Sequence, residues 1–188
     1  MLHYLKEFGK YAEITGYRNI KFSDAEAFLK AARRRSHIDV DLQFFDADLI
    51  ATPRHLYFAV LNALQAFQNK TSISKSLAVE TMLYTSAQRQ IQRAIGRCGI
   101  KPQTTNLAVV AIGDKPPDIQ SLLGEVTACV GSKPDEAVLE LTDAKLRRIK
   151  DVFGVKAEEI ASVAEDTNLE AAVVNLVVER VALLATQL

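Results

Sequence analysis

The stretch NLAVVAIG, residues 106–113, decides the fold of this chain. Residues 107–112 are all apolar and lack the alternation of polar and apolar positions that marks a half-exposed strand. A short apolar run that ends at a glycine predicts a strand buried on both faces. We therefore expect residues 106–112 to form the central strand of a sheet.

Two other segments carry strand patterns. Residues 37–45, HIDVDLQFF, alternate between apolar and polar side chains, which predicts a strand with one face in the core and the other in water, as in antiparallel sheets. Residues 11–20, YAEITGYRNI, mix aromatic and β-branched side chains around a glycine and predict a first strand or hairpin. In residues 37–45 the expected core face consists of Ile38, Val40, Leu42 and Phe44, and the expected wet face of Asp39, Asp41 and Gln43.

Capping and proline signals predict helices over most of the remaining chain. Ser23 with Glu26 forms a capping box, and Thr52 before Pro53 gives a cap followed by proline at the first helical position. The predicted helices cover residues 23–32, 52–68, 75–84, 86–99, 116–130, 142–153, 157–164 and 167–188. Because helices outnumber strands, we expect a single α+β domain over residues 1–188, in which a small, mostly antiparallel sheet packs with several helices and a long C-terminal helix.

The composition is that of a globular protein without bulk charge. Hydrophobic residues make up 48% of the chain, and 23 basic side chains balance 23 acidic ones, which argues against a disordered tail and against a protein that coats nucleic acid by charge alone. Cys98 and Cys129 lie in apolar helical patterns, as the buried thiols of cytosolic proteins do. Since no apolar run suits a signal peptide or a membrane span, the sequence predicts a cytoplasmic protein.

Charge is distributed unevenly along the chain. Residues 49–113 contain seven basic side chains and one acidic one, Glu80, whereas residues 114–188 contain eight basic and 14 acidic side chains. Such asymmetry indicates either that the two parts complement each other inside the fold, or that a basic face binds RNA and an acidic face binds another protein. The sequence leaves both interpretations open.

Catalytic chemistry has little support in the sequence. None of His3, His37 and His55 has a second histidine or a carboxylate at metal-ligand spacing. Asp46 and Asp48 fit turn residues better than a cation site, since no further oxygen ligand lies near them in the sequence. Because phosphate-binding glycine loops and nucleophile elbows are also absent from the sequence, we predict no catalytic residue, no metal site and no cofactor.

The segment of residues 80–100, ETMLYTSAQRQIQRAIGRCGI, predicts a binding surface. We expect a helix that is capped by Ser86 and ended by a left-handed Gly99. Arginines at four-residue steps form one stripe on this helix, opposite an apolar row. Because these arginines repel each other, the stripe indicates that a counter-charge lies against it. Phosphates and the chain's own acidic third are the two sources of that charge, and a solvated helix face remains the alternative. The predicted RNA-binding residues are Lys70, Thr71, Lys75, Tyr84 as a stacking platform, Arg89, Arg93 and Arg97.

The last predicted helix is apolar around most of its circumference. Such a helix is either enclosed by its own domain or covered by a partner, and its place at the end of the chain favours the partner. The residues that we expect to contact that partner are Val173, Leu176, Val177, Arg180 and Leu184.

The segment of residues 70–102, KTSISKSLAVETMLYTSAQRQIQRAIGRCGIKP, and TTNLAVVAIGD after it resemble one known family. The family is that of the kinase-binding subunit of the KEOPS complex, the TPRKB family, also called CGI one-two-one. The similarity extends to residues 13–20, to KLRRIKDVFGV at residues 145–155, and to the closing helix. The residues that carry it are Lys70, Thr71, Ser76, Glu80, Leu83, Ser86, Ile91, Ala94, Gly99 and Ile100.

The resemblance implies a non-catalytic protein that binds the small lobe of a Bud-type kinase/ATPase. Through that kinase it would be linked to the transferase subunit that makes threonylcarbamoyladenosine in tRNA, and it would hold the single-stranded 3′ CCA end of the tRNA. The kinase would contact the closing helix, and the tRNA would contact the basic segment. A protein-only regulatory module that activates its kinase without RNA is the alternative. In both, Glu80 is expected to pair with Arg54, Lys75 or a backbone amide and so to position the basic face.

Overall fold

The computed structural model describes residues 1–21, 39–163 and 168–186. The helix predicted at residues 23–32 and the cap predicted at Thr167 lie outside the described residues. The described strands are β1 (Leu2–Leu5), β2 (Lys10–Tyr17), β3 (Val40–Asp46) and β4 (Leu107–Gly113). The helices are α2 (Pro53–Gln68), α3 (Leu77–Ser86), α4 (Ile91–Cys98), α5 (Pro116–Val130), α6 (Asp143–Phe153), α7 (Ala157–Val163) and α8 (Leu169–Leu183), with 3-10 turns η1 (Lys6–Phe8), η2 (Ala47–Leu49), η3 (Glu136–Leu139) and η4 (Leu184–Thr186).

The strands form an antiparallel sheet in the order β1-β2-β4-β3. β4 lies in the interior of this sheet, where Val110 pairs with Ile14 of β2 on one side and with Gln43 of β3 on the other. Every residue of β4 is buried, as the apolar run at residues 106–112 predicts. The α+β class and the antiparallel sheet are therefore confirmed.

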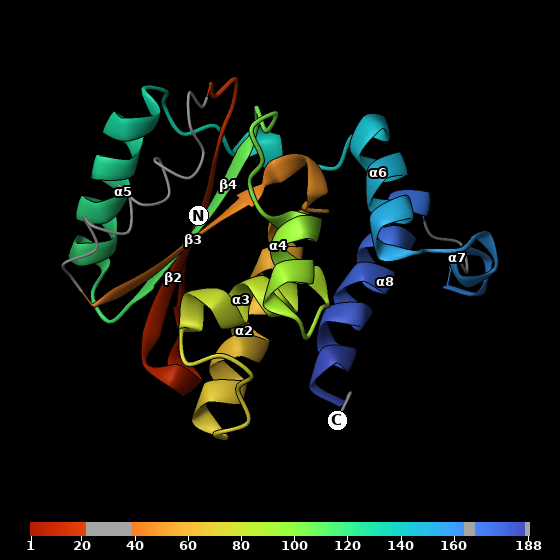
Figure 1. Ribbon diagram of the computed structural model, residues 1–188, viewed down its shortest axis with the longest axis horizontal. Helices are drawn as coiled ribbons and strands as arrows, with labels where there is room; N and C mark the ends of the chain where they lie inside the picture. The colour runs from red at the N-terminus through yellow and green to blue at the C-terminus, as the bar shows by residue number, and fades with distance from the viewer. Residues whose placement is uncertain (22–38, 164–167, 187–188) are drawn as a thin grey trace.

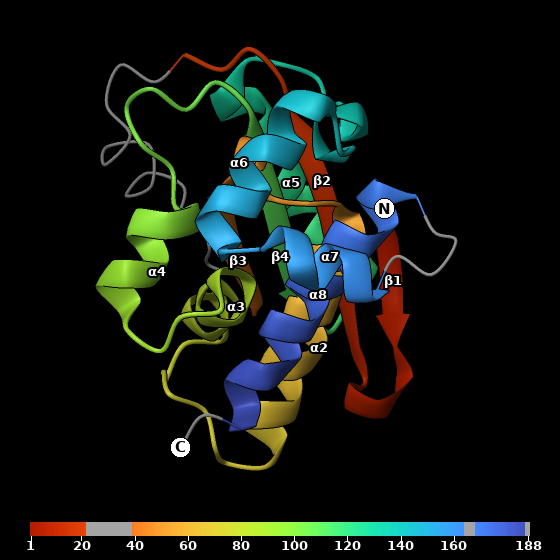
Figure 2. The ribbon, with the colours of Figure 1, turned by 90° about the vertical axis from the view of Figure 1, so that its right-hand side faces the viewer.

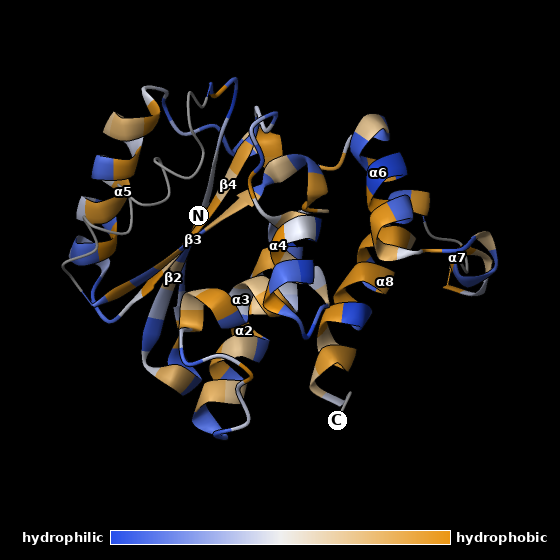
Figure 3. Ribbon diagram, viewed as in Figure 1, coloured by the Kyte–Doolittle hydropathy of each residue, from blue (hydrophilic) through white to orange (hydrophobic). Residues whose placement is uncertain are grey.

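Helices cover both faces of the sheet (Figure 1). α5 packs on one face, where Ile119 and Leu122 meet Val109 in a separate apolar core. α2 and α3 cover the other face, and α8 packs on these two helices from the side away from the sheet, so that all three contribute to the larger core. β4 and most of α8 are coloured hydrophobic in Figure 3; β4 is buried throughout, whereas α8 buries one face and exposes the other.

The predicted wet face of β3 is wrong. Val40 and Phe44 do point into the core beneath α5, as predicted. The opposite face, however, lies under α3, so that Gln43 is buried and Phe45 is fully enclosed. The Gln43 Nε2 donates to the Ala78 backbone oxygen at 3.0 Å, which supplies the partner that a buried amide needs.

The predicted helix over residues 86–99 is also wrong. Ser86 is the last residue of α3, and its buried hydroxyl donates to the Leu83 backbone oxygen at 3.1 Å instead of capping a new helix. Ala87 follows in the left-handed conformation with φ 49°, and α4 begins only at Ile91. Two helices are present, as predicted, but α3 extends through Ser86 and the second helix begins at Ile91 instead of directly after Ser86.

Gly99 ends α4 for a reason of space rather than of handedness. Its φ of −72° and ψ of 160° are extended, not left-handed as predicted. A Cβ at this position would lie 2.6 Å from the Ile95 backbone oxygen, so a side chain has no room here.

The remaining helices follow their sequence signals closely. α2 begins at Pro53, α5 spans Pro116–Val130, and α6 is capped by Thr142 and ended by a left-handed Gly154. α8 is capped by Asn168, whose side-chain oxygen accepts from the Glu170 amide at 3.0 Å. Among the described residues, no helix has the length and apolarity that a membrane crossing requires.

Candidate functional site

The buried carboxylate of Glu80 organises the loop between α2 and α3. Glu80 is fully enclosed, and its two oxygens accept from the backbone amides of Ile73 at 3.1 Å and of Ser74 at 2.7 Å. Backbone amides are one of the three partners expected for this residue. Because hydrogen bonds to an ionised acceptor are stronger than neutral ones, Glu80 fixes the path of residues 70–76 from inside.

The loop presents its polar residues to solvent. Lys70 adopts the left-handed conformation with φ 58°, and the backbone of Thr71 is tied to the end of α2 by its amide, which donates to the Ala66 oxygen at 2.9 Å. Lys70, Thr71 and Lys75 are all exposed. Three of the predicted RNA-binding residues thus share one loop.

The predicted arginine stripe does not form, because the chain turns at residues 87–90. Arg89 lies in this turn and is exposed, and Arg93 is exposed on the first part of α4. Arg97 is half-buried: its Nη1 donates to the Ser86 backbone oxygen at 2.9 Å, and its guanidinium carbon lies 5.6 Å from the centre of the Phe153 ring. Arg97 therefore joins α3, α4 and α6 rather than facing a ligand, which corrects its predicted role.

Tyr84 is not available as a stacking platform. Only 5% of its surface is exposed, and its ring belongs to the main core. Burial raises the pKa of its hydroxyl, and the charge of Glu80 adds to the rise. A base cannot stack on a ring that is already covered, so the RNA-binding prediction for Tyr84 is wrong.

Two isoleucines of α4 are left exposed instead. The apolar row predicted for this segment splits: Ala94 and Cys98 are fully buried, whereas Ile91 is 44% exposed and Ile95 48% exposed. Ile91 and Ile95 line a small apolar hollow of about 60 Å³ between α4, α3 and β3. Because periodicity places both residues in the core, no pattern in the sequence predicts this hollow.

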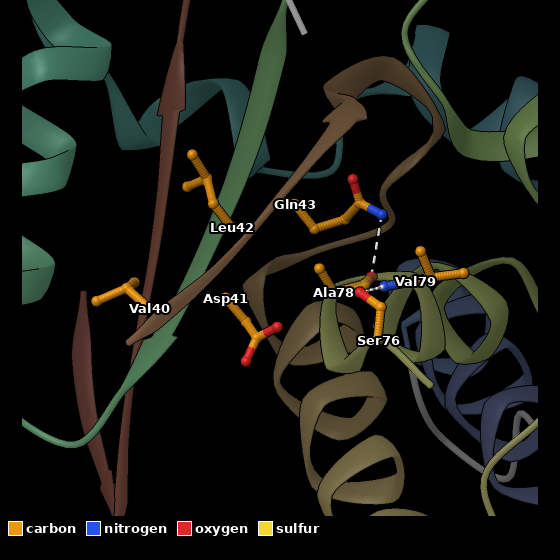
Figure 4. A pocket seen from close by; sticks show the side chains of 7 residues that line it. All are labelled: Val40, Asp41, Leu42, Gln43, Ser76, Ala78 and Val79. Carbon is orange, nitrogen blue, oxygen red and sulfur yellow. Dashed lines mark hydrogen bonds between the residues drawn. The ribbon is translucent and has the colours of Figure 1, made fainter. Parts of the chain in front are cut away.

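A second, larger hollow of about 350 Å³ adjoins the first (Figure 4). It lies between β3 and the beginning of α3, and it shares Gln43 and Val79 with the apolar hollow. Asp41 and Gln43 point from β3 toward α3 in this view. Burial raises the pKa of Asp41, while a hydrogen bond from the Ala78 backbone and the charge of Lys10 oppose the rise. Together the hollows form a groove beside α3, which we call the α3 groove.

Three exposed cations near the α3 groove lack an ion pair within the part of the chain that the structure describes. Lys70, Lys75 and Arg93 form no ion pair with any residue that the structure describes. Three acidic residues of the last third pair instead with cations outside the basic segment of residues 49–113. These pairs are Lys10 with Asp114 at 2.6 Å, Arg18 with Asp135 at 2.7 Å and Arg180 with Glu159 at 2.9 Å.

The residues predicted to bind a partner through α8 are mostly enclosed. α8 lies against α2 (Figure 2), and the side chains of Val173, Leu176, Val177 and Leu184 are buried. Arg180 is half-buried and bonded to both carboxylate oxygens of Glu159 at 2.9 and 3.0 Å. These four apolar residues therefore hold α8 to its own domain, and the exposed apolar side chains of the helix are Leu169 and Leu183, each 46% exposed.

Most buried polar groups of the described residues have hydrogen-bond partners, the hydroxyls of Thr52 and Thr85 being exceptions. His55 accepts the Ala51 amide through Nδ1 at 3.3 Å, so its Nε2–H donates to the Thr85 oxygen at 2.8 Å, and burial lowers its pKa to about 4. Burial raises the pKa of Cys98 to about 12, which keeps this thiol protonated. Among the described residues, no group of three or more His, Cys, Asp or Glu side chains is arranged to hold a metal ion.

Comparison with known proteins gives the family. Residues 17–185 match the family model described as kinase binding protein CGI-121. The chain is similar to the "Regulatory protein Cgi121" of Methanocaldococcus jannaschii, with 28% identity over 64% of this chain and 74% of the relative. It is also similar to the "EKC/KEOPS complex subunit CGI121" of Coccidioides immitis, with 23% identity over 70% of this chain and 67% of the relative. Since the family model spans most of its length, the chain belongs to the kinase binding protein CGI-121 family.

Proposed function

We propose that this chain, as a member of the family, is a non-catalytic accessory subunit of the KEOPS complex. The complex is taken from the name of the fungal relative and the kinase from the description of the family. The chain binds the Bud-type kinase/ATPase subunit directly and the threonylcarbamoyl transferase subunit only through that kinase. It also recruits tRNA by its single-stranded 3′ CCA end, and so supports threonylcarbamoyladenosine modification.

The α3 groove is the observation that carries the tRNA part of this proposal. A single-stranded end offers flat bases and spaced phosphates, so its site combines apolar surface with cations. Exposed Ile91 and Ile95 supply the apolar surface. Arg89 and Arg93 lie at or near the beginning of α4, and Lys75 lies just before α3. Bases would rest on the isoleucines while the cations contact phosphates.

The test is tRNA binding, measured by fluorescence anisotropy at several salt concentrations, with and without the CCA end. Arg93→Glu should weaken binding by about tenfold or more near 0.1 M salt. It should also lower the magnitude of the slope of log affinity against log salt concentration by about 1, the value for one lost phosphate contact. Ile91→Ser should weaken binding without changing the salt dependence, because it removes apolar contact and no charge. Arg147→Glu, on the exposed part of α6, is the matched charge-reversal control. Equal affinities for tRNA with and without the CCA end would contradict the proposal.

The kinase contact needs surface that the core does not use. We place it on the exposed stripe of α8 that ends at Leu183. Leu183→Glu should abolish capture of the kinase subunit while the far-ultraviolet circular dichroism stays unchanged. Leu169→Glu, equally exposed at the opposite end of α8, is the control. Normal kinase capture by a folded Leu183→Glu variant would remove this assignment.

A protein-only regulatory module is the second candidate. The enclosure of Tyr84 and the internal bonds of Arg97 favour it, because they remove two of the expected RNA contacts. This module would stimulate the ATPase activity of its kinase with no tRNA present, and it would not bind tRNA even at 50 mM salt. Kinase stimulation measured beside tRNA anisotropy separates the two candidates.

A further inference from the structure

A cavity of about 250 Å³ lies away from the α3 groove, where η2, η3 and the first turns of α6 meet the ends of β2 and β4. Its lining is strongly polar. The side chains that matter are Arg18, Asp48, Asn106, Glu140, Lys145 and Arg148. Neither the tRNA contact nor the kinase contact proposed above uses this cavity.

Lys145 is the unusual member of this lining. Only 6% of its surface is exposed. Its Nζ donates to the Val138 backbone oxygen at 3.0 Å, and no carboxylate of the described residues lies within 4.0 Å of it. An ammonium group has three donors and is costly to bury without a counter-ion. Lys145 thus brings to the cavity a charge without a direct ion pair, together with unused donors.

The groups around Lys145 add to the positive character of the cavity. The cavity borders the beginning of α6, where the backbone amides of the first turn and the helix dipole favour an anion. Arg148 and Arg18 each already have a carboxylate partner, Asp48 at 2.8 Å and Asp135 at 2.7 Å.

Two acidic residues also line the cavity, and they differ in their surroundings. Asp48 is held by Arg148 and by the Asn106 amide at 2.9 Å, which occupies its oxygens. Glu140 is exposed. Burial lowers the pKa of Lys145 to about 8, while the charges of Asp48, Asp46 and Glu140 oppose the fall, so the ammonium is still mostly protonated at pH 7.

We propose that this cavity binds a small oxyanion, a phosphate or carboxylate group, between the Lys145 ammonium and the first turn of α6. The anion supplies a direct ion pair, which no carboxylate of the described residues makes with Lys145. It also accepts the unused N–H donors of the lysine. The volume suits a small free anion rather than a folded macromolecule.

The experiment is a thermal unfolding series with the full chain in chloride, inorganic phosphate or acetate at matched ionic strength. At ten times its Kd, a specific anion should raise the Tm by about 3 to 5 °C. Lys145→Met, which keeps the length of the side chain, should lose most of this shift, and Arg147→Met on the same helix should keep it. Stabilisation by phosphate alone or by both anions supports the site and identifies the preferred group.

An NMR titration of the unmodified chain keeps the proposal testable if Lys145→Met fails to fold. Phosphate or acetate should cause saturable shifts of the backbone amides of Ala144 and Lys145, with little change at Arg147. The proposal is overturned if neither anion moves these amides at 50 mM. It is equally overturned if Lys145→Met, properly folded, shows the same Tm shift as the unmodified chain.

Discussion

Replacing Glu80 by glutamine should loosen the loop that carries Lys70 and Lys75 without unfolding the domain. The carboxylate accepts two backbone amides inside the protein. Glutamine keeps one acceptor oxygen and turns an NH2 group toward the other amide, so one charge-assisted hydrogen bond is lost and one buried N–H is left unsatisfied. Each of these effects costs about 1 to 3 kcal/mol, so we expect the free energy of unfolding to fall by about 2 to 6 kcal/mol.

Three measurements follow this substitution. Urea unfolding gives the loss of stability, with Glu179→Gln on the exposed side of α8 as a control that should change it by less than about 0.5 kcal/mol. Hydrogen exchange should become faster at the amides of Ile73 and Ser74, the two that Glu80 holds. The affinity for tRNA should fall with the salt dependence unchanged, since every cation remains.

A specific pair of results would contradict the role of Glu80 in holding the loop. If Glu80→Gln lowers the unfolding free energy by less than about 0.5 kcal/mol and leaves the exchange of Ile73 and Ser74 unchanged, the carboxylate does not hold the loop. If only the tRNA affinity stays the same, the loop is held as described but does not contact RNA.

Three further predictions concern the interior. The pKa of His55 is about 4 in the folded chain and 6.5 in the unfolded chain, so the unfolded chain binds the proton first as the pH falls. About 3 kcal/mol of stability that is present above pH 6.5 should therefore be lost as the pH falls to 4. In urea unfolding, the stability of His55→Gln should depend less on pH than that of the unmodified chain. Gly99→Ala should destabilise the domain by about 1 to 3 kcal/mol, because the new Cβ meets the Ile95 backbone oxygen. Gly96→Ala adds a Cβ in open space and should stabilise α4 by up to about 1 kcal/mol. Urea unfolding measures both changes. Arg97→Met should lower the free energy of unfolding by about 1 to 3 kcal/mol, because a hydrogen bond to the backbone and a cation–π contact are lost. A stability equal to that of the unmodified chain would contradict the bridging role of Arg97.

The sequence and the structure disagree most clearly between Tyr84 and Gly99. The sequence predicts a helix capped by Ser86, yet α3 continues through Ser86 and the chain turns at Ala87, so Arg89 lies outside the helix that contains Arg93 and Arg97. The turn depends on packing, since α3 must end where its buried face ends. No local signal in the sequence marks a turn at Ala87, because alanine has no preference for the left-handed conformation.

The burial of side chains was predicted correctly only where the local sequence pattern determines it. The sequence by itself determined the buried strand β4, the antiparallel sheet, and the bounds of α5 and α6, because apolar runs, prolines and caps act locally. Only the tertiary structure decided that α3 covers Gln43, that α2 encloses the apolar face of α8, and that Ile91 and Ile95 stay exposed. Which face meets water depends on the layer that packs against it, and that layer comes from residues far away in the chain.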